Sequence, residues 1–266
     1  MTSIHPTAIV DARATISPGV EIGPYCIVGP DVVLGDDCRL ISHVVIDGRT
    51  QLGKECRVHP FAVIGQPPQD MKYRGEPSEL FIGARTVIRE HVTLNPGTER
   101  GGMVTRVGTD CLLMATTHVA HDCQVGNHVV MANNATLGGH VHVGDHAVLG
   151  GLSAIHQYVR IGHHAMIGGM SGVERDVIPY GSVMGNRAHL SGLNTVGMKR
   201  RGIGHDEIIV MRQAYRMMFE SEGTFADRLA EVAELFADRP RVMEIVSFIR
   251  EATQRSICTP ERLRNV

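Results

Sequence analysis

The chain has 266 residues and a formal net charge of −2, from 26 basic and 28 acidic side chains. Because these charges nearly balance, the chain lacks the basic footprint of a nucleic-acid-binding protein. The opening residues MTSIHPTAIVDARA do not resemble a signal peptide, and no apolar run approaches the roughly 18 residues of a membrane span. We therefore expect a cytoplasmic protein without a transmembrane segment, built as one long domain or as one domain with an appendage.

An aliphatic residue recurs every six positions over residues 10–64, 82–94 and 107–173. The fifth position of each hexad is small or β-branched. A period of six fits neither an α-helix nor an alternating strand, but it fits a parallel β-helix in which each hexad forms one short side and a turn. Three hexads then make one coil, and the aliphatic and small residues fill a narrow interior.

Five of the six cysteines fall on the fifth position of a hexad: Cys26, Cys38, Cys56, Cys111 and Cys123. A free thiol behaves as a small apolar group, so we predict that these cysteines fill the interior rather than form disulfides or bind metal. Cys258 lies outside the repeat and receives no prediction.

Two segments interrupt the repeat. Residues 66–80 (QPPQDMKYRGEPSEL) are rich in proline and polar residues, and residues 96–106 (PGTERGGMVTR) are rich in glycine. We expect both to leave the β-helix as loops, and loops on a rigid scaffold often carry binding residues.

Hexads end near residue 178, and helical spacing follows over residues 206–222, 225–238 and 241–255. Glycine and proline separate these segments. The sequence thus predicts a β-helix with two loop insertions over residues 1–186 and a small α-helical C-terminal domain over residues 187–266.

Histidines gather on one side of the predicted β-helix, because residues 18 apart stack in successive coils. Three stacked hexads contain His121, His140 and His156 in turn. His118 ends the hexad that precedes the first of them. None of the four occupies an inward position, so we expect them on an exposed face.

Two neighbours give His121 a chemical role. Asp122 can hydrogen-bond the ring and hold the tautomer that leaves one nitrogen free as a base. Gly139 lies one coil above His121, and its uncovered backbone N–H can stabilise an oxyanion. A histidine that titrates near pH 6.5 is a suitable base for a hydroxyl nucleophile at neutral pH.

The segments HVAHDCQVGN, NNATLGGHVHVGD, GGLSAIHQYVRIG, GLNTVGMKRRG and QDMKYRGEP resemble the UDP-N-acetylglucosamine acyltransferase family of lipid A biosynthesis. The likeness runs along essentially the whole chain. It implies a left-handed parallel β-helix of hexapeptide repeats followed by a small helical domain. It also implies a homotrimer with active sites in clefts between subunits.

The same resemblance implies the reaction. An (R)-3-hydroxyacyl group moves from acyl carrier protein to the 3-hydroxyl of UDP-N-acetylglucosamine, which is the first step of lipid A biosynthesis, and neither a metal nor a dissociable cofactor is required. In this family His121 corresponds to the general base, Asp122 to its orienting partner, and Gly139 to the oxyanion donor.

Further positions match residues of the family that contact substrates. The sugar-binding positions are Gln69, Asp70 and Lys72, the cleft-lining positions are His118, His140, His156 and Gln157, and the positions that engage the nucleotide, its phosphates or the acyl donor are Asn194, Arg200 and Arg201. Val196 departs from the acidic residue that the family often has there.

Gly169 matches the position that limits acyl length, with Met166 and Met170 as the next candidates; a glycine predicts a longer acyl chain.

Three other readings stay open from the sequence. A β-helical carbonic anhydrase would hold zinc on His118, His121 and His140. A scaffold without enzymatic activity would leave the stacked histidines unexplained. A related acyltransferase would form an amide on a 3-amino sugar nucleotide, and the residues alone do not separate it from an O-acyltransferase.

Overall fold

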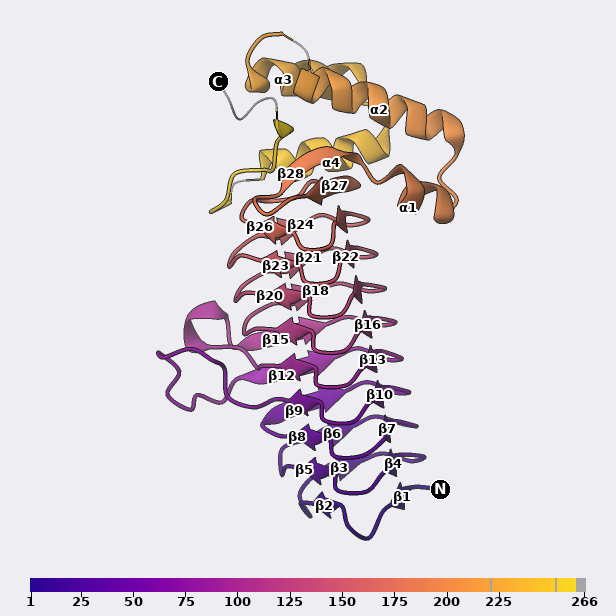
Figure 1. Ribbon diagram of the computed structural model, residues 1–266, viewed down its shortest axis with the longest axis vertical. Coiled ribbons are helices and arrows are strands. Elements are labelled where there is room, and N and C mark those ends of the chain that lie inside the picture. The colour runs from indigo at the N-terminus through magenta and orange to yellow at the C-terminus, as the bar shows by residue number, and fades with distance from the viewer. Residues whose placement is uncertain (221, 252, 262–266) are drawn as a thin grey trace.

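The computed structural model describes residues 1–220, 222–251 and 253–261, and it has the form of a long prism with helices packed on one end (Figure 1). Within these residues, the strands form three sheets of 11, 9 and 8 strands, one along each side of the prism. Successive strands along the chain belong to successive sheets, so the backbone winds around a common axis.

The eleven-stranded sheet contains β1 (Ser3–Ile4), β4 (Glu21–Ile22), β7 (Arg39–Leu40), β10 (Arg57–Val58), β13 (Val87–Ile88), β16 (Leu112–Leu113), β19 (Val130–Met131), β22 (Val148–Leu149), β25 (Met166–Ile167), β27 (Gly181–Met184) and β28 (His189–Leu193). The nine-stranded sheet contains β2 (Ile9–Val10), β5 (Ile27–Val28), β8 (Val45–Ile46), β11 (Val63–Ile64), β14 (Thr93–Leu94), β17 (His118–Val119), β20 (Thr136–Leu137), β23 (Ala154–Ile155) and β26 (Gly172–Val173). The eight-stranded sheet contains β3 (Thr15–Ile16), β6 (Val33–Leu34), β9 (Arg49–Leu52), β12 (Glu79–Ile82), β15 (Val104–Val107), β18 (Gln124–Val125), β21 (His142–Val143) and β24 (Arg160–Ile161).

The register confirms that three hexads make one coil. Val119 pairs in parallel with Leu137, and Leu137 with Ile155, each one coil further along the axis. All three side chains are buried, as are the small residues at the fifth positions, such as Ala135. The hexad pattern therefore correctly predicted both the coil and its interior.

Each regular corner between two sheets places its fourth hexad residue in the left-handed region, for example Asp122 at φ 61°, His140 at φ 62° and Tyr158 at φ 66°. L-residues rarely adopt this conformation, and Asp, Asn and His tolerate it better than most. The side chains of these residues form columns along the three corners of the prism.

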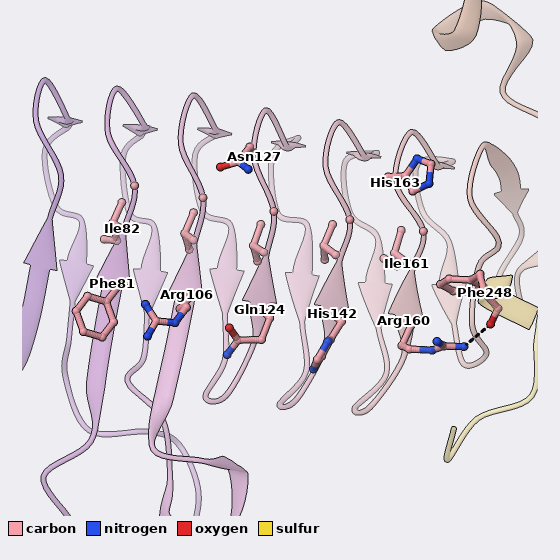
Figure 2. Close-up of a pocket in the computed structure, with 18 of the residues that line it drawn as sticks. Phe81, Ile82, Arg106, Gln124, Asn127, His142, Arg160, Ile161, His163 and Phe248 are labelled. Atoms are coloured by element: carbon pink, nitrogen blue, oxygen red, sulfur yellow. Dashed lines mark hydrogen bonds between the residues drawn. The ribbon is translucent and has the colours of Figure 1, made fainter. Parts of the chain in front are cut away.

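The outer face of the eight-stranded sheet carries an open groove of about 650 Å³ (Figure 2). The guanidinium of Arg106 lies over the ring of Phe81 at 4.4 Å, and that of Arg160 lies over the ring of Phe248 at 4.1 Å. The hexad pattern does not predict this groove, because its walls come from five coils and from a helix distant in the chain.

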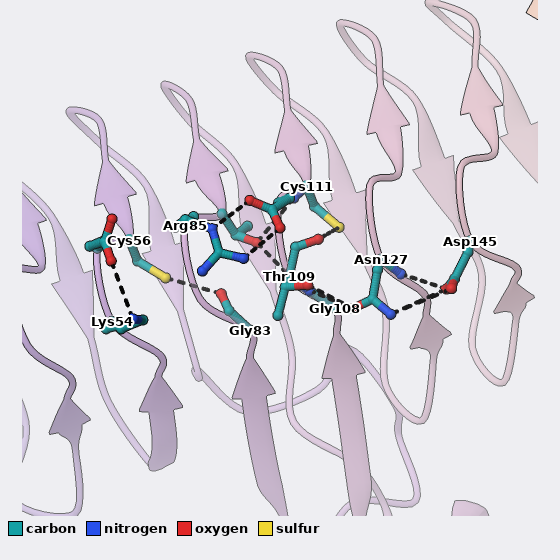
Figure 3. A network of polar contacts seen from close by, with 12 residues as sticks. Lys54, Cys56, Gly83, Arg85, Gly108, Thr109, Cys111, Asn127 and Asp145 are labelled. Carbon is teal, nitrogen blue, oxygen red and sulfur yellow. Dashed lines mark hydrogen bonds and ion pairs between the residues drawn. The ribbon is translucent and has the colours of Figure 1, made fainter. Parts of the chain in front are cut away.

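All six cysteines are buried, and the five within the hexads form no disulfides, as predicted. The thiols of Cys38, Cys56, Cys111 and Cys123 donate to backbone carbonyls of the next coil, for example Cys56 Sγ to Gly83 O at 3.2 Å (Figure 3). Burial raises the pKa of Cys111 to about 11 and that of Cys123 to about 12. These thiols are structural, since a nucleophilic cysteine needs a lowered pKa.

The two expected loops project from the prism side by side (Figure 1). They are shorter than predicted, spanning residues 65–78 and 95–103, because β12 and β15 are extended to four residues and pair with each other. A 3₁₀ turn, Glu99–Gly101, lies within the second loop. Asn95 Nδ2 donates to Gln66 O at 3.0 Å and the Glu99 N–H to Glu76 Oε1 at 3.3 Å, so each loop supports the other.

Four helices follow the strands: α1 (Thr195–Arg200), α2 (His205–Glu220), α3 (Phe225–Leu235) and α4 (Pro240–Arg250). The three predicted helices are present but end earlier than expected, and residues 221 and 252 of the predicted ranges lie outside the described residues. Pro240 begins α4 and thereby separates it from α3. The short α1 was not predicted, since it depends on a side-chain cap by Asn194.

The C-terminal part is less helical than predicted. The strands continue past residue 186 to Leu193, and residues 253–260 return along the prism, where Ile257 forms a parallel bridge with Asp176. No helix within residues 1–220, 222–251 and 253–261 combines the length and the apolarity that crossing a bilayer requires.

At the corner between the eight- and eleven-stranded sheets, the rings of His128, His146, His164 and Tyr180 form a continuous stack. Neighbouring centroids are 4.6, 4.8 and 5.2 Å apart, and the planes are within 11° of parallel. The pKa of His164 is lowered to about 4, chiefly by burial and next by the neighbouring His146. The pKa of His146 is also lowered, chiefly by burial.

We expect this stack to make the fold sensitive to acid. An unfolded histidine titrates at about 6.5, whereas folded His164 titrates at about 4. The unfolded chain therefore binds the extra proton first, so the contribution of His164 to stability is complete above pH 6.5 and is lost as the pH falls from 6.5 to 4. The melting temperature of His164→Phe should fall less between pH 7 and pH 4.5 than that of the wild type. The exposed His5→Phe should follow the wild-type curve; equal acid sensitivity of all three proteins would refute the prediction.

Candidate active site

His121 and Asp122 lie in the corner between the nine- and eight-stranded sheets, directly after β17. His121 Nδ1 lies 2.8 Å from Asp122 Oδ2. Burial would raise the pKa of Asp122, but hydrogen bonds from His121 and Thr98 outweigh burial and hold this pKa below its ordinary value. Because the ionised carboxylate can only accept, Nδ1 carries the proton and Nε2 presents its lone pair.

The second loop covers this pair. Asp122 Oδ1 accepts from the Thr98 N–H at 2.9 Å and Oδ2 from Thr98 Oγ1 at 2.6 Å. The Asp122 N–H donates to Thr105 Oγ1 at 2.7 Å. His121 is consequently only 9 % exposed. The predicted exposed face is therefore wrong for His121, because the loop closes over a corner that would be open in a regular coil.

Gly139 lies against the His121 ring. A Cβ on Gly139 would be 2.5 Å from His121 Cε1 and 2.7 Å from Nε2, so any side chain there would displace the ring. The Gly139 N–H has no hydrogen-bond acceptor among the described residues. The third hexad position makes no backbone hydrogen bond through its N–H: some of these positions hold proline, such as Pro24, and at Thr109 and Asn127 the N–H donates to a side chain instead. At Gly139 the unpaired N–H lies beside the base, where it can bind a developing oxyanion.

His140 occupies the next coil. Its ring meets that of His121 edge-on at 5.0 Å and stacks on Tyr158 at 4.4 Å, with Nδ1 3.8 Å from Asp122 Oδ2. Burial lowers the pKa of His140, although Asp122 opposes this shift. The ring is thus neutral at pH 7 and lies beside that of His121.

His118 precedes the corner in β17, and its Nδ1 hydrogen-bonds Thr93 Oγ1 at 2.7 Å. Burial lowers the pKa of His118, and the neighbouring His121 lowers it further. His118 is therefore a neutral group beside the base.

One donor atom from each of His121, Asp122 and His140 lies within 4.8 Å of the other two, which is close enough for a metal ion. This set of possible ligands differs from the three histidines of the zinc hypothesis, since it contains Asp122 in place of His118. Both oxygens of Asp122 already accept hydrogen bonds, and His121 Nδ1 is one of the donors. This bonding pattern fits a histidine base with an orienting carboxylate better than a metal site.

The first loop brings one predicted sugar-binding residue close to the histidines. Asp70 is near enough to raise the pKa of His140 by charge attraction, and its Oδ1 accepts from the Lys72 N–H at 3.0 Å. The side chains of Gln69 and Lys72 are exposed to solvent. The structure thus places Asp70 beside the cluster and leaves the other two at the rim.

His156 and Gln157 lie two coils beyond His121. Gln157 continues the column formed by His121 and Gly139, which the register of β17, β20 and β23 fixes. Two coil spacings amount to roughly 10 Å. Both side chains are exposed, as predicted for His156.

Asn194, Arg200 and Arg201 lie at a different corner of the prism. Asn194 Nδ2 donates to His164 O at 2.9 Å, while its Oδ1 accepts from the Gly197 N–H at 3.0 Å and caps α1. Arg201 Nη2 donates to His146 O at 3.1 Å, and Arg200 is exposed. A single chain therefore does not bring these three residues to His121.

The residues expected to limit acyl length lie at or beside the third corner, between the eleven- and nine-stranded sheets. Gly169 and Met170 are exposed in the turn after β25, and Met166 is half-buried within β25. A Cβ on Gly169 would be 3.3 Å from Gly151 O, with open space otherwise. Gly169 and His121 therefore lie at opposite edges of the nine-stranded sheet.

Sequence analysis missed Thr98 and Thr105, which fix Asp122, and Tyr158, which stacks on His140. Tyr158 could have been found, because it is 18 residues after His140 and so belongs to the same column. Thr98 had no such signal, since it lies in a loop without a repeat.

Two family models match different parts of the chain. Residues 176–258 match the model described as Udp N-acetylglucosamine O-acyltransferase, domain 2, and residues 1–36 and 105–139 match that of the bacterial transferase hexapeptide (six repeats). The acyl-[acyl-carrier-protein]--UDP-N-acetylglucosamine O-acyltransferase of Caulobacter vibrioides is 56 % identical over 98 % of this chain and 99 % of its own length. That of Azorhizobium caulinodans is 54 % identical over 97 % of this chain and 96 % of its own length.

Solved structures agree along the whole chain. The UDP-N-acetylglucosamine acyltransferase of Francisella novicida superposes with a TM-score of 0.94 at 32 % identity, covering 99 % of this chain and 96 % of that one. The UDP-N-acetylglucosamine O-acyltransferase of Moraxella catarrhalis RH4 gives 0.92 at 41 % identity, covering 96 % and 98 %. The predicted fold is confirmed: a left-handed parallel β-helix of hexapeptide repeats, followed by helices.

Proposed function

Because this chain belongs to the UDP-N-acetylglucosamine O-acyltransferase family, we propose that it transfers an (R)-3-hydroxyacyl group from acyl carrier protein to the 3-hydroxyl of UDP-N-acetylglucosamine, the first step of lipid A biosynthesis. Relatives that carry this activity in their names match nearly the full chain at more than half identity. The observation that supports the chemistry is the 2.8 Å contact between His121 and buried Asp122, beside the unpaired N–H of Gly139.

His121 acts as the general base. Its Nε2 takes the proton of the sugar 3-hydroxyl as the oxygen attacks the thioester carbonyl. Asp122 accepts from Nδ1 and stabilises the imidazolium that forms. The oxygen–carbon bond forms, the carbon–sulfur bond breaks, and His121 returns the proton to the departing thiolate.

Gly139 stabilises the tetrahedral intermediate through its backbone N–H. The acyl group is already activated as a thioester, so the reaction uses neither a metal nor a dissociable cofactor. No covalent acyl-enzyme is needed either, and the buried Cys111 and Cys123 have raised pKa values.

The remaining predicted residues bind substrate. Asp70, beside His140, and the rim residues Gln69 and Lys72 contact the sugar, while His118, His140, His156 and Gln157 line the cleft. Carrier protein and nucleotide sugar are both made in the cytoplasm, so we place the reaction there.

We propose a homotrimer as the active form. Large apolar side chains stand exposed along the corner between the eleven- and nine-stranded sheets: Tyr25 at 57 %, Phe61 at 49 %, Leu152 at 60 % and Met170 at 75 %. His43, His91, Thr116 and Asn134 separate these side chains along the same corner, and such a stripe of exposed apolar groups marks an interaction surface. Three copies that meet at this corner around a threefold axis bury the stripe, and in a parallel arrangement each nine-stranded face meets an eleven-stranded face.

This arrangement also completes the site. The nine-stranded sheet of one subunit then faces the eleven-stranded sheet of the next. The corner that carries His121 lies beside the neighbouring corner that carries α1, so Asn194, Arg200 and Arg201 of the partner subunit reach the nucleotide. The acyl chain extends across the nine-stranded sheet towards Gly169, near the axis.

His121→Ala should lower kcat by about 10²- to 10⁴-fold, the usual cost of losing a general base. His118→Ala serves as a neighbouring control and should mainly weaken substrate binding. Turnover is measured with the acyl carrier thioester and UDP-N-acetylglucosamine, and circular dichroism verifies the fold. Near-normal turnover of a folded His121→Ala protein would rule out the assigned base.

Leu152→Glu should dissociate the trimer, since it places three carboxylates around the proposed axis. Sedimentation should give three chains for the wild type and one for the variant, whose turnover should fall in parallel. Tyr158→Glu, at a corner away from the axis, should stay trimeric. A monomeric wild-type enzyme with full turnover would contradict the proposal.

Gly169→Met should shift the preferred acyl donor to a shorter chain, because the new side chain fills the end of the acyl path. Each methylene excluded from an apolar site costs about 0.8 kcal/mol, so a difference of four carbons changes relative rates by orders of magnitude. Competing 3-hydroxyacyl carrier thioesters measure the preference, and the KM for UDP-N-acetylglucosamine should not change. An unaltered chain-length profile would move the stop to Met166 or Met170.

A further inference from the structure

The C-terminal segment, residues 253–260, is held against the prism at the end where the nucleotide is proposed to bind. The Asp176 N–H donates to Ser256 O at 2.9 Å, and the Cys258 N–H donates to Asp176 O at 2.7 Å. The Leu190 N–H donates to Thr259 O at 3.0 Å. These bonds fix the position of Arg255 within the segment.

Arg255 reaches two residues of the proposed cleft. Its Nε donates to Gln157 O at 3.1 Å, and its Nη2 lies 2.7 Å from His156 Nδ1. The two acceptors are themselves 3.3 Å apart. One edge of the planar guanidinium thus donates to both acceptors. The fork of an arginine permits this geometry, whereas the single ammonium group of a lysine does not.

This contact determines the tautomer of His156. A guanidinium has five N–H donors and no acceptor, and it does not lose its proton in proteins. Nδ1 of His156 must therefore accept, so the proton of the neutral ring resides on Nε2. Without Arg255, Nδ1 would instead be free to carry the proton and to donate to Gln157 O.

Arg255 also brings charge to the cleft. Three of its five N–H groups stay available, and no carboxylate pairs with it in the parts of the chain that the structure describes. Two acids of this region, Asp176 and Glu251, are both paired with Arg160. His156 and Gln157 are neutral partners, so the positive charge is not compensated locally.

We propose that Arg255 is a positioning residue for nucleotide-sugar binding. It holds His156 as an Nε2–H donor and presents its own positive charge to the diphosphate, roughly two coil spacings, or about 10 Å, from the base His121. The inference rests on the proposed function and extends it to a residue of the C-terminal segment that the sequence did not single out.

The decisive variant is Arg255→Ala. We expect its KM for UDP-N-acetylglucosamine to rise about tenfold, the loss of one charge-assisted contact, with kcat and the KM for the acyl carrier thioester changed less than about threefold. Nitrogen-15 NMR of histidine-labelled protein should show His156, assigned by the loss of its signal in His156→Gln, in the Nε2–H form in the wild type. In Arg255→Ala it should show a mixture of tautomers.

Two further variants test the mechanism. Arg255→Lys keeps the charge but loses the fork, so it should recover part of the KM effect and none of the tautomer preference. Arg250→Ala removes an exposed cation from the last turn of α4 and should match the wild type in both measurements. The proposal fails if Arg255→Ala leaves KM and the tautomer unchanged, if Arg250→Ala causes the same change, or if Arg255→Lys restores the tautomer.

A rise confined to the KM of the acyl carrier thioester would also overturn the proposal, because Arg255 would then serve the carrier protein. Failure of the proposed function is separate. If the wild type transfers no acyl group, the tautomer spectrum and a calorimetric titration with UDP still decide whether Arg255 positions His156 and binds a diphosphate.

Discussion

The parallel hydrogen-bond ladder between coils is the interaction on which the rest of the structure depends. It pairs Val119 with Leu137 and Leu137 with Ile155, and so stacks every residue on its counterpart 18 positions away. A shift of one residue would turn the aliphatic side chains outwards, so burial holds this register firmly. The column of His121, Gly139 and Gln157 is a direct consequence of it.

The corners between the sheets supply the residues of the proposed active site. A regular corner leaves the N–H of its third residue outside the backbone ladder and puts its fourth residue in the left-handed region. At most corners these features are only tolerated, by a proline or by an exposed side chain. At the site they supply an oxyanion donor at Gly139 and direct Asp122 and His140 into one column.

Burial of the Asp122 carboxylate is unfavourable by itself, and the second loop compensates for it. Thr98 contributes two hydrogen bonds and His121 a third, so each donor is matched to a carboxylate oxygen. An isolated buried charge costs several kcal/mol, whereas one that accepts several hydrogen bonds stays ionised. The loop therefore acts on the base indirectly, by keeping its partner charged.

The sequence by itself determined the β-helix, its interior cysteines and the stacking of Gly139 on His121, because a strict period of six converts chain position directly into place on the prism. Only the tertiary structure revealed the contacts made by residues outside the repeat. Thr98 reaches Asp122 across a loop, Asn194 caps a short helix on the far corner, and Arg255 returns from the chain end to His156. Such contacts join segments with no common repeat, and loop and tail conformations follow from packing against the finished prism rather than from local pattern.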